Sequence, residues 1–153
     1  MSGAVSARLH LCGPDDLERL LPMVAAFHAE QGIAQDDDGR LTALAPLLAG
    51  SPYGAVYLIG PARAPVGYLV VTFTWSIGFG GLEAILTDLW IRPAVRGRGM
   101  AAEASAALAG SLASAGVVAM SAQAAPGSAA ERLFKRLGFT MRTASAIMSR
   151  PLA

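Results

Sequence analysis

The sequence contains little cysteine and histidine, and it has no long hydrophobic run. Its 153 residues include one cysteine, Cys12, so no disulfide forms within the chain and a reducing compartment is expected. Two histidines far apart in the sequence, together with one cysteine, do not predict a metal site. No segment approaches the roughly 18 consecutive apolar residues of a membrane helix, and the N-terminus has no signal-peptide pattern. We therefore expect a cytoplasmic protein that binds neither metal nor membrane.

Charged residues are also scarce, at 15% of the chain, but they are unevenly distributed. Residues 1–91 carry nine acids and four arginines, a net charge of −5, whereas residues 92–153 carry eight basic residues and two acids, a net charge of +6. The second segment favours a polyanionic ligand and the first favours a cationic one. No aromatic residues are interleaved with the arginines of the basic segment, so a nucleic-acid partner is not expected.

Residues 89–101 predict a strand, a short turn rich in glycine and arginine, and an alanine-rich helix. Such a turn exposes unpaired backbone N–H groups at the positive end of the helix dipole, which suits it to hold a phosphate. Gly97 and Gly99 let an anion approach the backbone closely, and Arg96 and Arg98 add charge-assisted contacts. The turn is therefore predicted to bind a phosphorylated cofactor.

Two other kinds of phosphate site are less consistent with the sequence. Gly97-x-Gly99-x-x-Ala102 fits the dinucleotide fingerprint, but the next predicted strand, residues 117–123, ends without the acidic residue that holds the ribose. Too little chain follows the turn for a second mononucleotide half. A P-loop is excluded because its motif is absent and the only lysine is Lys135.

The turn Arg96-Gly97-Arg98-Gly99-Met100-Ala101 fits the pattern Gln/Arg-x-x-Gly-x-Gly/Ala. It follows Leu89-Trp90-Ile91-Arg92-Pro93, and a later segment reads Phe134-Lys135-Arg136-Leu137-Gly138-Phe139. In this order and context the chain resembles the GNAT superfamily of N-acetyltransferases, over roughly residues 55–150. The resemblance implies acetyl-CoA (coenzyme A) as the cofactor, with the backbone of Leu89, Trp90 and Ile91 pairing with its pantetheine arm. The pyrophosphate would be held by Arg96, Gly97, Arg98, Gly99, Met100 and Ala101.

Hydrophobic periodicity and turn residues divide the chain into alternating helices and strands. The expected strands lie near residues 7–11, 55–59, 66–75, 82–91, 117–122 and 146–149. The expected helices begin near Pro14, Leu41, Met100 and Ser128. We expect one α/β domain over residues 1–153, with a mixed, mostly antiparallel sheet and helices on both faces. The resemblance implies the same order and a splayed sheet.

Acetyl transfer to an amine needs a group that takes a proton from the ammonium, and the long strand offers two carboxylates. Asp88 directly precedes Leu89-Trp90, where a subset of the family carries an acid, so it is the first candidate for general base or acceptor binding. A purely structural hydrogen bond is the alternative for Asp88. Glu83 is a secondary candidate, since five residues along an unbulged strand place it on the opposite face, and a bulge would reverse this.

The sequence departs from the family at the position that supplies the leaving-group proton. Many members carry an asparagine followed seven residues later by a tyrosine, and here these positions are Gly127 and Phe134. A thiolate with a pKa near that of a free thiol, about 8.5, is a fair leaving group without an acid. Tyr53, Tyr57 and Tyr68 are possible substitutes that the sequence does not place.

Acceptor-lining candidates are Phe27, His28 and Glu30, near the end of the first helix, and Trp75, each of which has a packing or surface role as its alternative. The acidic run 36–38 is read either as lining or as a helix cap. We expect direct acetyl transfer to a small primary amine. The alternatives are a catalytically weak acyl-CoA-binding or regulatory module and a protein or peptide N-terminal acetyltransferase. The resemblance allows a homodimer but identifies no interface.

Overall fold

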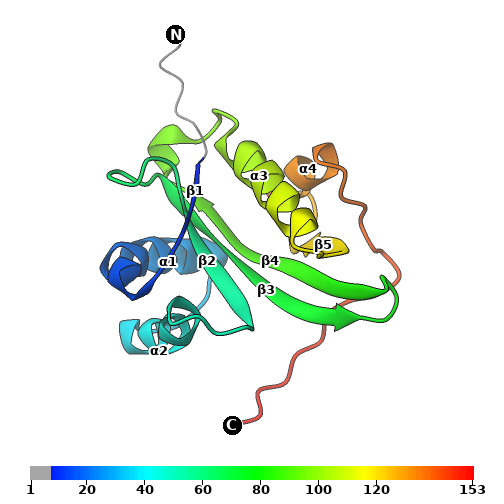
Figure 1. Cartoon of the computed structure of the whole chain (residues 1–153), viewed down its shortest axis with the longest axis horizontal. Helices are drawn as coiled ribbons and strands as arrows, with labels where there is room; N and C mark the ends of the chain where they lie inside the picture. The colour runs from blue at the N-terminus through cyan, green and yellow to red at the C-terminus, as the bar shows by residue number, and fades with distance from the viewer. Residues whose placement is uncertain (1–7) are drawn as a thin grey trace. The chain divides into compact units, whose positions relative to one another are not determined.

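The computed structural model describes residues 8–153. Its central element is a five-stranded mixed sheet (Figure 1). The strands follow one another across the sheet in chain order, β1-β2-β3-β4-β5. The first four pair antiparallel, and the last pairs parallel to β4. Their bounds are β1 Leu9–Leu11, β2 Gly54–Ile59, β3 Gly67–Ser76, β4 Gly81–Ile91 and β5 Ala119–Ala122.

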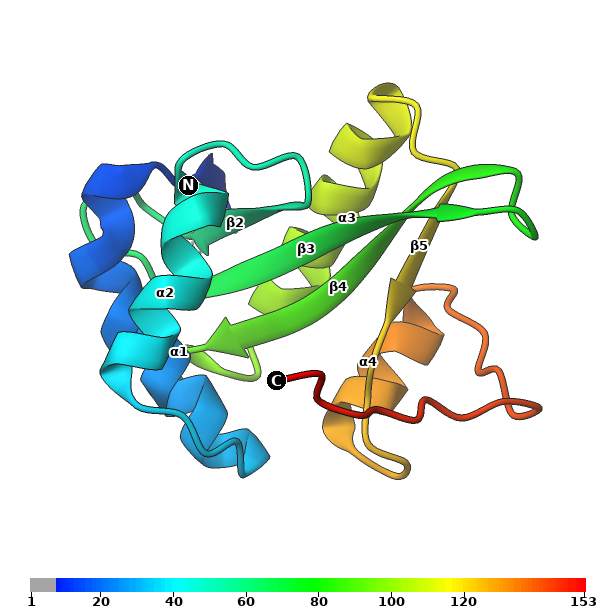
Figure 2. The ribbon, with the colours of Figure 1, turned by 90° about the horizontal axis from the view of Figure 1, so that it is seen from below.

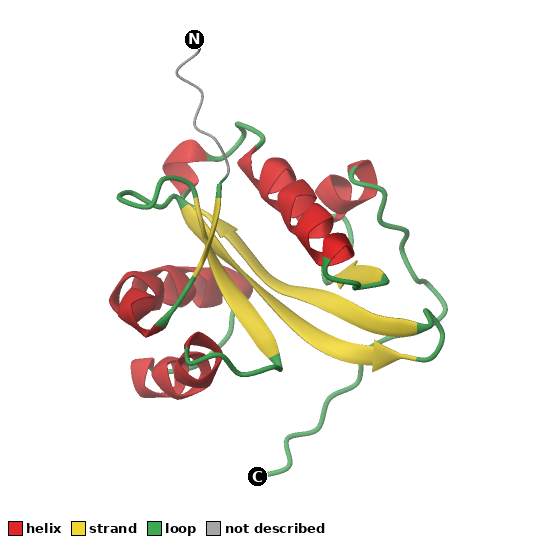
Figure 3. Ribbon diagram, in the orientation of Figure 1, coloured by secondary structure: helices red, strands yellow, loops and turns green. Residues whose placement is uncertain are grey.

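Helices cover both faces of this sheet, which confirms the predicted α/β architecture (Figures 2 and 3). Two lie on one face, α1 (Leu17–Gln31) and α2 (Asp37–Leu48), and α3 (Met100–Ser114) lies on the other. Short 3-10 turns, Pro14–Asp16 and Pro93–Val95, precede α1 and α3.

The chain divides into two compact units, one ending at Gln123 and one spanning Ala124–Ala153 that contains α4 (Ala129–Arg136). The single-domain expectation stays a prediction.

The core of the first unit forms where the alternating side chains of the sheet meet α1 and α2. Tyr68, Val70 and Trp90 contribute to this core from β3 and β4, and all three are less than a tenth exposed. The helices contribute Leu20, Met23, Val24, Leu44 and Leu48. Burying each of these side chains stabilises the fold by about 1.5–3 kcal/mol, so this packing holds α1 and α2 against the sheet.

The second helix begins earlier than predicted, at Asp37 rather than near Leu41. The cause is a cap, because the Asp36 carboxylate accepts a hydrogen bond from the Gly39 N–H at 2.7 Å. Asp37 and Asp38 occupy the first turn, where negative charge complements the helix dipole. The acidic run 36–38 therefore serves as a helix start.

The predicted strand over residues 146–149 is wrong, because these residues adopt no regular secondary structure. A strand requires a neighbour for its backbone groups, and the described part of the chain pairs none with this segment. The first strand is shorter than the predicted 7–11, and residue 7 lies outside the described residues. The other elements begin and end within a few residues of their predicted bounds.

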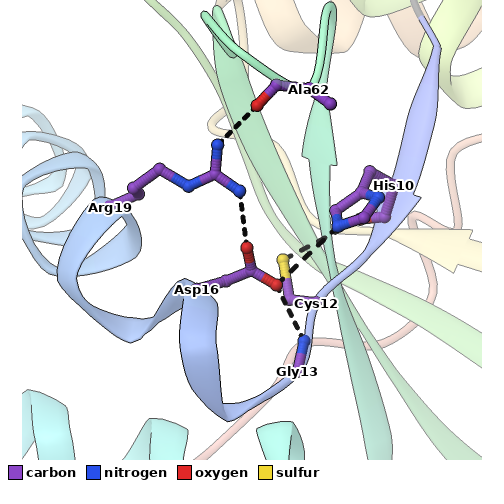
Figure 4. Close-up of polar contacts among 6 residues, drawn as sticks. All are labelled: His10, Cys12, Gly13, Asp16, Arg19 and Ala62. Carbon is purple, nitrogen blue, oxygen red and sulfur yellow. Dashed lines mark hydrogen bonds and ion pairs between the residues drawn. The ribbon is translucent and has the colours of Figure 1, made fainter.

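A buried carboxylate joins β1 to the start of α1 (Figure 4). Asp16 accepts hydrogen bonds from the Gly13 N–H at 2.9 Å and from Arg19 Nη2 at 2.6 Å, and His10 Nε2 lies 3.8 Å away. The Arg19 hydrogen bond is the main reason that the pKa of Asp16 is lowered. Burial, followed by the Asp16 charge, raises the pKa of the neighbouring Cys12 thiol to about 12, so Cys12 remains a protonated thiol near neutral pH.

We predict that Asp16→Asn lowers the free energy of unfolding at pH 7 by about 1–3 kcal/mol, the usual cost of disrupting a buried charged hydrogen bond. Because folding lowers the pKa of Asp16, its contribution is present above the unfolded-state value of 3.8 and is lost as pH falls through the folded-state value. Urea denaturation at pH 7 and pH 3 checks this. The exposed Asp15→Asn control should change stability by less than about 0.5 kcal/mol, and a difference between Asp16→Asn and wild type that does not shrink at pH 3 would contradict the assignment.

Candidate active site

The sheet opens between β4 and β5 over the second half of β4 (Figure 2). Their parallel pairing covers only Glu83 to Leu86 of β4, opposite Ala119 to Ala122. From residue 88 to 91, β4 keeps its β3 partner but has no β5 partner among the described residues. Alternate residues of a strand direct their backbone groups to opposite edges, so Leu89 and Ile91 face the β5 side, whereas Trp90 faces its β3 partner Tyr68.

The turn after β4 has the backbone that its two glycines predict. Gly97 and Gly99 have φ angles of 79° and 78°, in the left-handed region that favours glycine. A Cβ at either position would meet nothing within 4 Å, so conformation rather than space requires glycine here. Gly99 is the N-cap of α3 and offers no side-chain cap, so the N–H groups of the first helical turn face the turn's surface. Met100 is buried and anchors the helix start.

The arginines of the turn lie in different environments. Arg96 donates from Nε to the Ile91 carbonyl at 2.7 Å and forms an ion pair from Nη2 to Glu30 Oε1 at 2.6 Å. Arg92 donates to the Pro65 carbonyl at 3.1 Å, which ties the end of β4 to the loop between β2 and β3. Arg98 is exposed and has no ion pair among the described residues. Within residues 8–153 the charge of Arg98 is therefore unmatched, whereas the Arg96 guanidinium is held by two bonds.

A register shift in β4 brings the two candidate carboxylates to one face of the sheet. Val70 lies opposite Asp88 and Val71 lies opposite Leu86, so Thr87 is an extra, bulged residue. Glu83 lies opposite Thr74, which shares a face with Val70 on the regularly alternating β3. The bulge thus reverses the expectation for an unbulged strand, and Glu83 and Asp88 both face the side covered by α1 and α2.

Each carboxylate already has a hydrogen-bond partner from a neighbouring strand. The Tyr68 hydroxyl donates to Asp88 Oδ2 at 2.8 Å, and the Ser121 hydroxyl donates to Glu83. Burial, reinforced by the Asp88 charge, raises the pKa of Tyr68 above its usual range, so Tyr68 keeps its proton. Glu83 is 8% exposed, whereas Asp88 is only partly buried. Asp88 is the more accessible of the two carboxylates.

The acceptor candidates lie in different places. Phe27 packs edge-on against Tyr68, with ring centroids 6.1 Å apart, and His28 Nδ1 accepts from Arg40 Nε at 3.2 Å. Glu30 reaches Arg96 on the turn. Trp75 is 71% exposed near the far end of β3 and lies on the face opposite to Asp88, since its position differs in parity from Val70. The structure brings Phe27 and Glu30 toward the end of β4, but it directs His28 to α2 and leaves Trp75 at the far end of β3.

In the second unit, Phe134 occupies a core position. Its side chain is 7% exposed, and its ring packs against Phe139 with centroids 5.1 Å apart. Ser128 caps α4 by accepting from the Glu131 N–H, and Glu131 accepts from the Gly127 N–H at 2.9 Å. Gly127 and Phe134 therefore have clear structural roles, and neither side chain carries a proton donor.

Sequence reasoning did not identify the Tyr68–Asp88 hydrogen bond or the bulge at Thr87. Tyr68 appeared only as one of three unplaced tyrosines, because the register between β3 and β4 cannot be read from residue spacing.

Within residues 8–153 no group of three or more His, Cys, Asp or Glu side chains is arranged to hold a metal ion. In the same residues no helix has the length and apolar character needed to cross a membrane.

Comparison with known proteins connects this geometry to acetyltransferases. A family model described as FR47-like protein matches residues 73–148. No curated protein matches the sequence significantly. The integron cassette protein HFX_CASS3 from the mobile metagenome of Cole Harbour Salt Marsh is 27% identical, with a TM-score of 0.79 over 95% of this chain and 90% of that one. A putative acetyltransferase from Arthrobacter sp. FB24 is 26% identical, with a TM-score of 0.78 over 99% of this chain and all of that one.

A third solved structure contains a nucleotide cofactor. The aminoglycoside N-acetyltransferase AAC(6')-Iy in complex with CoA has a TM-score of 0.80, covering 100% of this chain and 99% of that one. The two sequences are 16% identical, and the TM-score establishes that they share a fold. The parallel pairing that stops at Leu86 and the turn that precedes α3 are thus features of a chain with an acetyltransferase fold.

We predict that Asp88 and Tyr68 are energetically coupled. Asp88→Ala leaves the buried Tyr68 hydroxyl without its acceptor and should lower the free energy of unfolding by about 1–3 kcal/mol. In a Tyr68→Phe background the same substitution should cost clearly less, because no hydroxyl remains to be satisfied. A double-mutant cycle by urea denaturation measures the coupling. Additive effects of the two substitutions would show that the hydrogen bond contributes nothing to stability.

Proposed function

Since the chain belongs to the GNAT superfamily of acetyltransferases, we propose that it transfers an acetyl group from acetyl-CoA to a primary amine of a small molecule. Transfer is direct, in a complex that holds both substrates. The observation that carries this proposal is that β4 loses its β5 partner directly before a glycine turn that opens a helix. Along the chain, the open strand edge is followed by the helix N-terminus. In coenzyme A, the amide-bearing pantetheine arm is likewise followed by the pyrophosphate.

The chain's own groups fit coenzyme A on three counts. The edge of β4 over residues 87–91 has no β5 partner among the described residues and offers backbone donors and acceptors for pantetheine amides, apart from the Ile91 carbonyl that Arg96 already contacts. The N–H groups after Gly99 and the α3 dipole favour the pyrophosphate. The exposed Arg98 adds a positive charge at the same turn. The cofactor supplies an activated acetyl thioester when bound.

In this proposal Asp88 is the proton acceptor for the amine. It lies on the part of β4 that has no β5 partner among the described residues, it is only partly buried, and the Tyr68 hydroxyl fixes one of its oxygens. The second oxygen remains for an ammonium or a bridging water. A backbone N–H near Trp90 is the candidate donor to the developing oxyanion. Glu83 has less access and a partner in Ser121, so it takes a supporting role.

No tyrosine is proposed as the leaving-group acid. Phe134 lacks a hydroxyl, and Tyr68 is fully buried with a raised pKa that opposes proton release. A thiolate of pKa about 8.5 departs without a dedicated acid. The presence of Phe134 where many family members carry a tyrosine also favours a second candidate function, a catalytically weak acyl-CoA-binding or regulatory module. In that case the chain binds the cofactor but does not respond to amines.

The acceptor is proposed to be a small cationic amine. The segment that carries Glu30, Glu83 and Asp88 has a net charge of −5, which attracts such a molecule. The similar AAC(6')-Iy is by name an aminoglycoside N-acetyltransferase, so aminoglycosides belong in the first set of acceptors to be tested. A cytoplasmic location and a homodimer remain expectations of the sequence.

The first test is release of free thiol from acetyl-CoA in the presence of amines, polyamines, amino acids, aminoglycosides and short peptides. We expect stimulation by at least one small amine, because the open β4 edge and Asp88 lie together. Binding of acetyl-CoA without stimulation by any acceptor would favour the binding module. Stimulation by peptides alone would favour N-terminal acetylation, and the absence of cofactor binding would overturn the proposal.

The second test is Asp88→Asn, which keeps the shape of the side chain but removes its basicity. Turnover should fall by about 10²-fold or more, the usual contribution of a general base, while the Kd for acetyl-CoA stays within about twofold. Thiol release at saturating amine, from pH 6 to pH 9, measures the loss. Glu83→Gln is the matched control and should affect turnover much less. Intact turnover of Asp88→Asn at every pH would remove Asp88 from the role of base.

A further inference from the structure

One ion pair connects the last turn of α1 to the turn that precedes α3. Glu30 Oε1 lies 2.6 Å from Arg96 Nη2, although the two residues are 66 positions apart in the chain. Their side chains are 38% and 44% exposed, so both are accessible to a ligand. Glu30 is the penultimate residue of α1, and Arg96 begins the glycine turn. The contact thus joins the side proposed for the acceptor to the side proposed for the cofactor.

Arg96 cannot leave the turn easily, because a second bond holds it. Its Nε donates to the carbonyl of Ile91, the last residue of β4, at 2.7 Å. The guanidinium is therefore fixed at the end of the strand, and Glu30 occupies part of its remaining donor face. A carboxylate and a phosphate use this fork of donors in the same way, so they compete for it.

The other arginines of the turn carry no such counter-ion. Arg92 donates to a backbone carbonyl, and Arg98 has no ion pair among the described residues. Of the three, Arg96 alone has its charge matched by a carboxylate in this part of the structure. Neutralising a cation beside a helix N-terminus reduces the attraction of that site for anions. The identity of Glu30 therefore bears on cofactor affinity.

We propose that Glu30 is an intramolecular competitor of the cofactor's phosphate for Arg96. This inference rests on the proposed coenzyme A site. In the free protein the Glu30 carboxylate occupies Arg96; a phosphate at the glycine turn displaces it and leaves Glu30 free at the end of α1. Glu30 therefore lowers the affinity for coenzyme A, which eases departure of the product, and the displaced carboxylate becomes available to a cationic acceptor.

The test measures the Kd of coenzyme A by isothermal titration calorimetry for wild type, Glu30→Gln, Arg96→Gln and the double variant. Glu30→Gln should bind about threefold to tenfold more tightly, the scale of a half-exposed ion pair. In the Arg96→Gln background the same change should leave Kd unaltered, because the contested guanidinium is gone. Glu18→Gln, an exposed carboxylate of the first turn of α1, is the matched control and should not change Kd.

Each other outcome overturns the inference in a different way. Unchanged or weaker binding by Glu30→Gln would make the ion pair a clamp that organises the turn. An equal gain in Glu18→Gln would show a general effect of net charge, and an equal gain in the Arg96→Gln background would show that Glu30 acts without Arg96. In these cases wild type still binds coenzyme A and the proposed function stands. If neither wild type nor any variant binds coenzyme A, the cofactor site and this inference both fail.

Discussion

The end of the β4–β5 pairing at Leu86 is the constraint on which the site depends. Parallel strands satisfy each other's backbone groups. A strand that continues past the end of its neighbour therefore exposes donors and acceptors along that edge. In β4 this edge spans residues 87–91 and leads directly into the turn that opens α3. The edge that we propose for an extended ligand is thus followed along the chain by a helix N-terminus.

The extra residue at Thr87 determines which face of the sheet carries the two acidic side chains of β4. Without the bulge, Glu83 and Asp88 would project to opposite faces of the sheet. With it, both carboxylates lie on the α1 and α2 side, and Asp88 meets the Tyr68 hydroxyl. A small change of register thus decides which side of the sheet carries negative charge. It also explains how an acid can sit at the edge of an otherwise apolar core that includes Val70 and Trp90.

The charges on the two sides of the site are not independent. The acidic segment 1–91 and the basic segment that begins at residue 92 meet in the Glu30–Arg96 ion pair, where α1 ends against the glycine turn. Opposite charges held this close stabilise the approach of the two elements, and they also partly cancel the field that each side presents to a ligand. The Asp16–Arg19 pair at the other end of α1 shows the purely structural use of the same interaction, within a buried network.

The strand, glycine turn and helix over residues 89–101 were predictable from the sequence, because strand alternation, positive φ at Gly97 and Gly99 and helix initiation are local properties. The order of the elements up to β5 followed for the same reason. The start of α2 differs from the prediction near Leu41 because the Asp36 carboxylate caps the helix earlier. The strand predicted at 146–149 does not form, since none of the described residues pairs with it. The sequence by itself determined the strand, turn and helix at which we propose that a phosphate binds. Only the tertiary structure decided that Tyr68 would meet Asp88 and that Glu30 would meet Arg96, because these contacts join residues 20 and 66 positions apart and depend on sheet register and on where α1 packs.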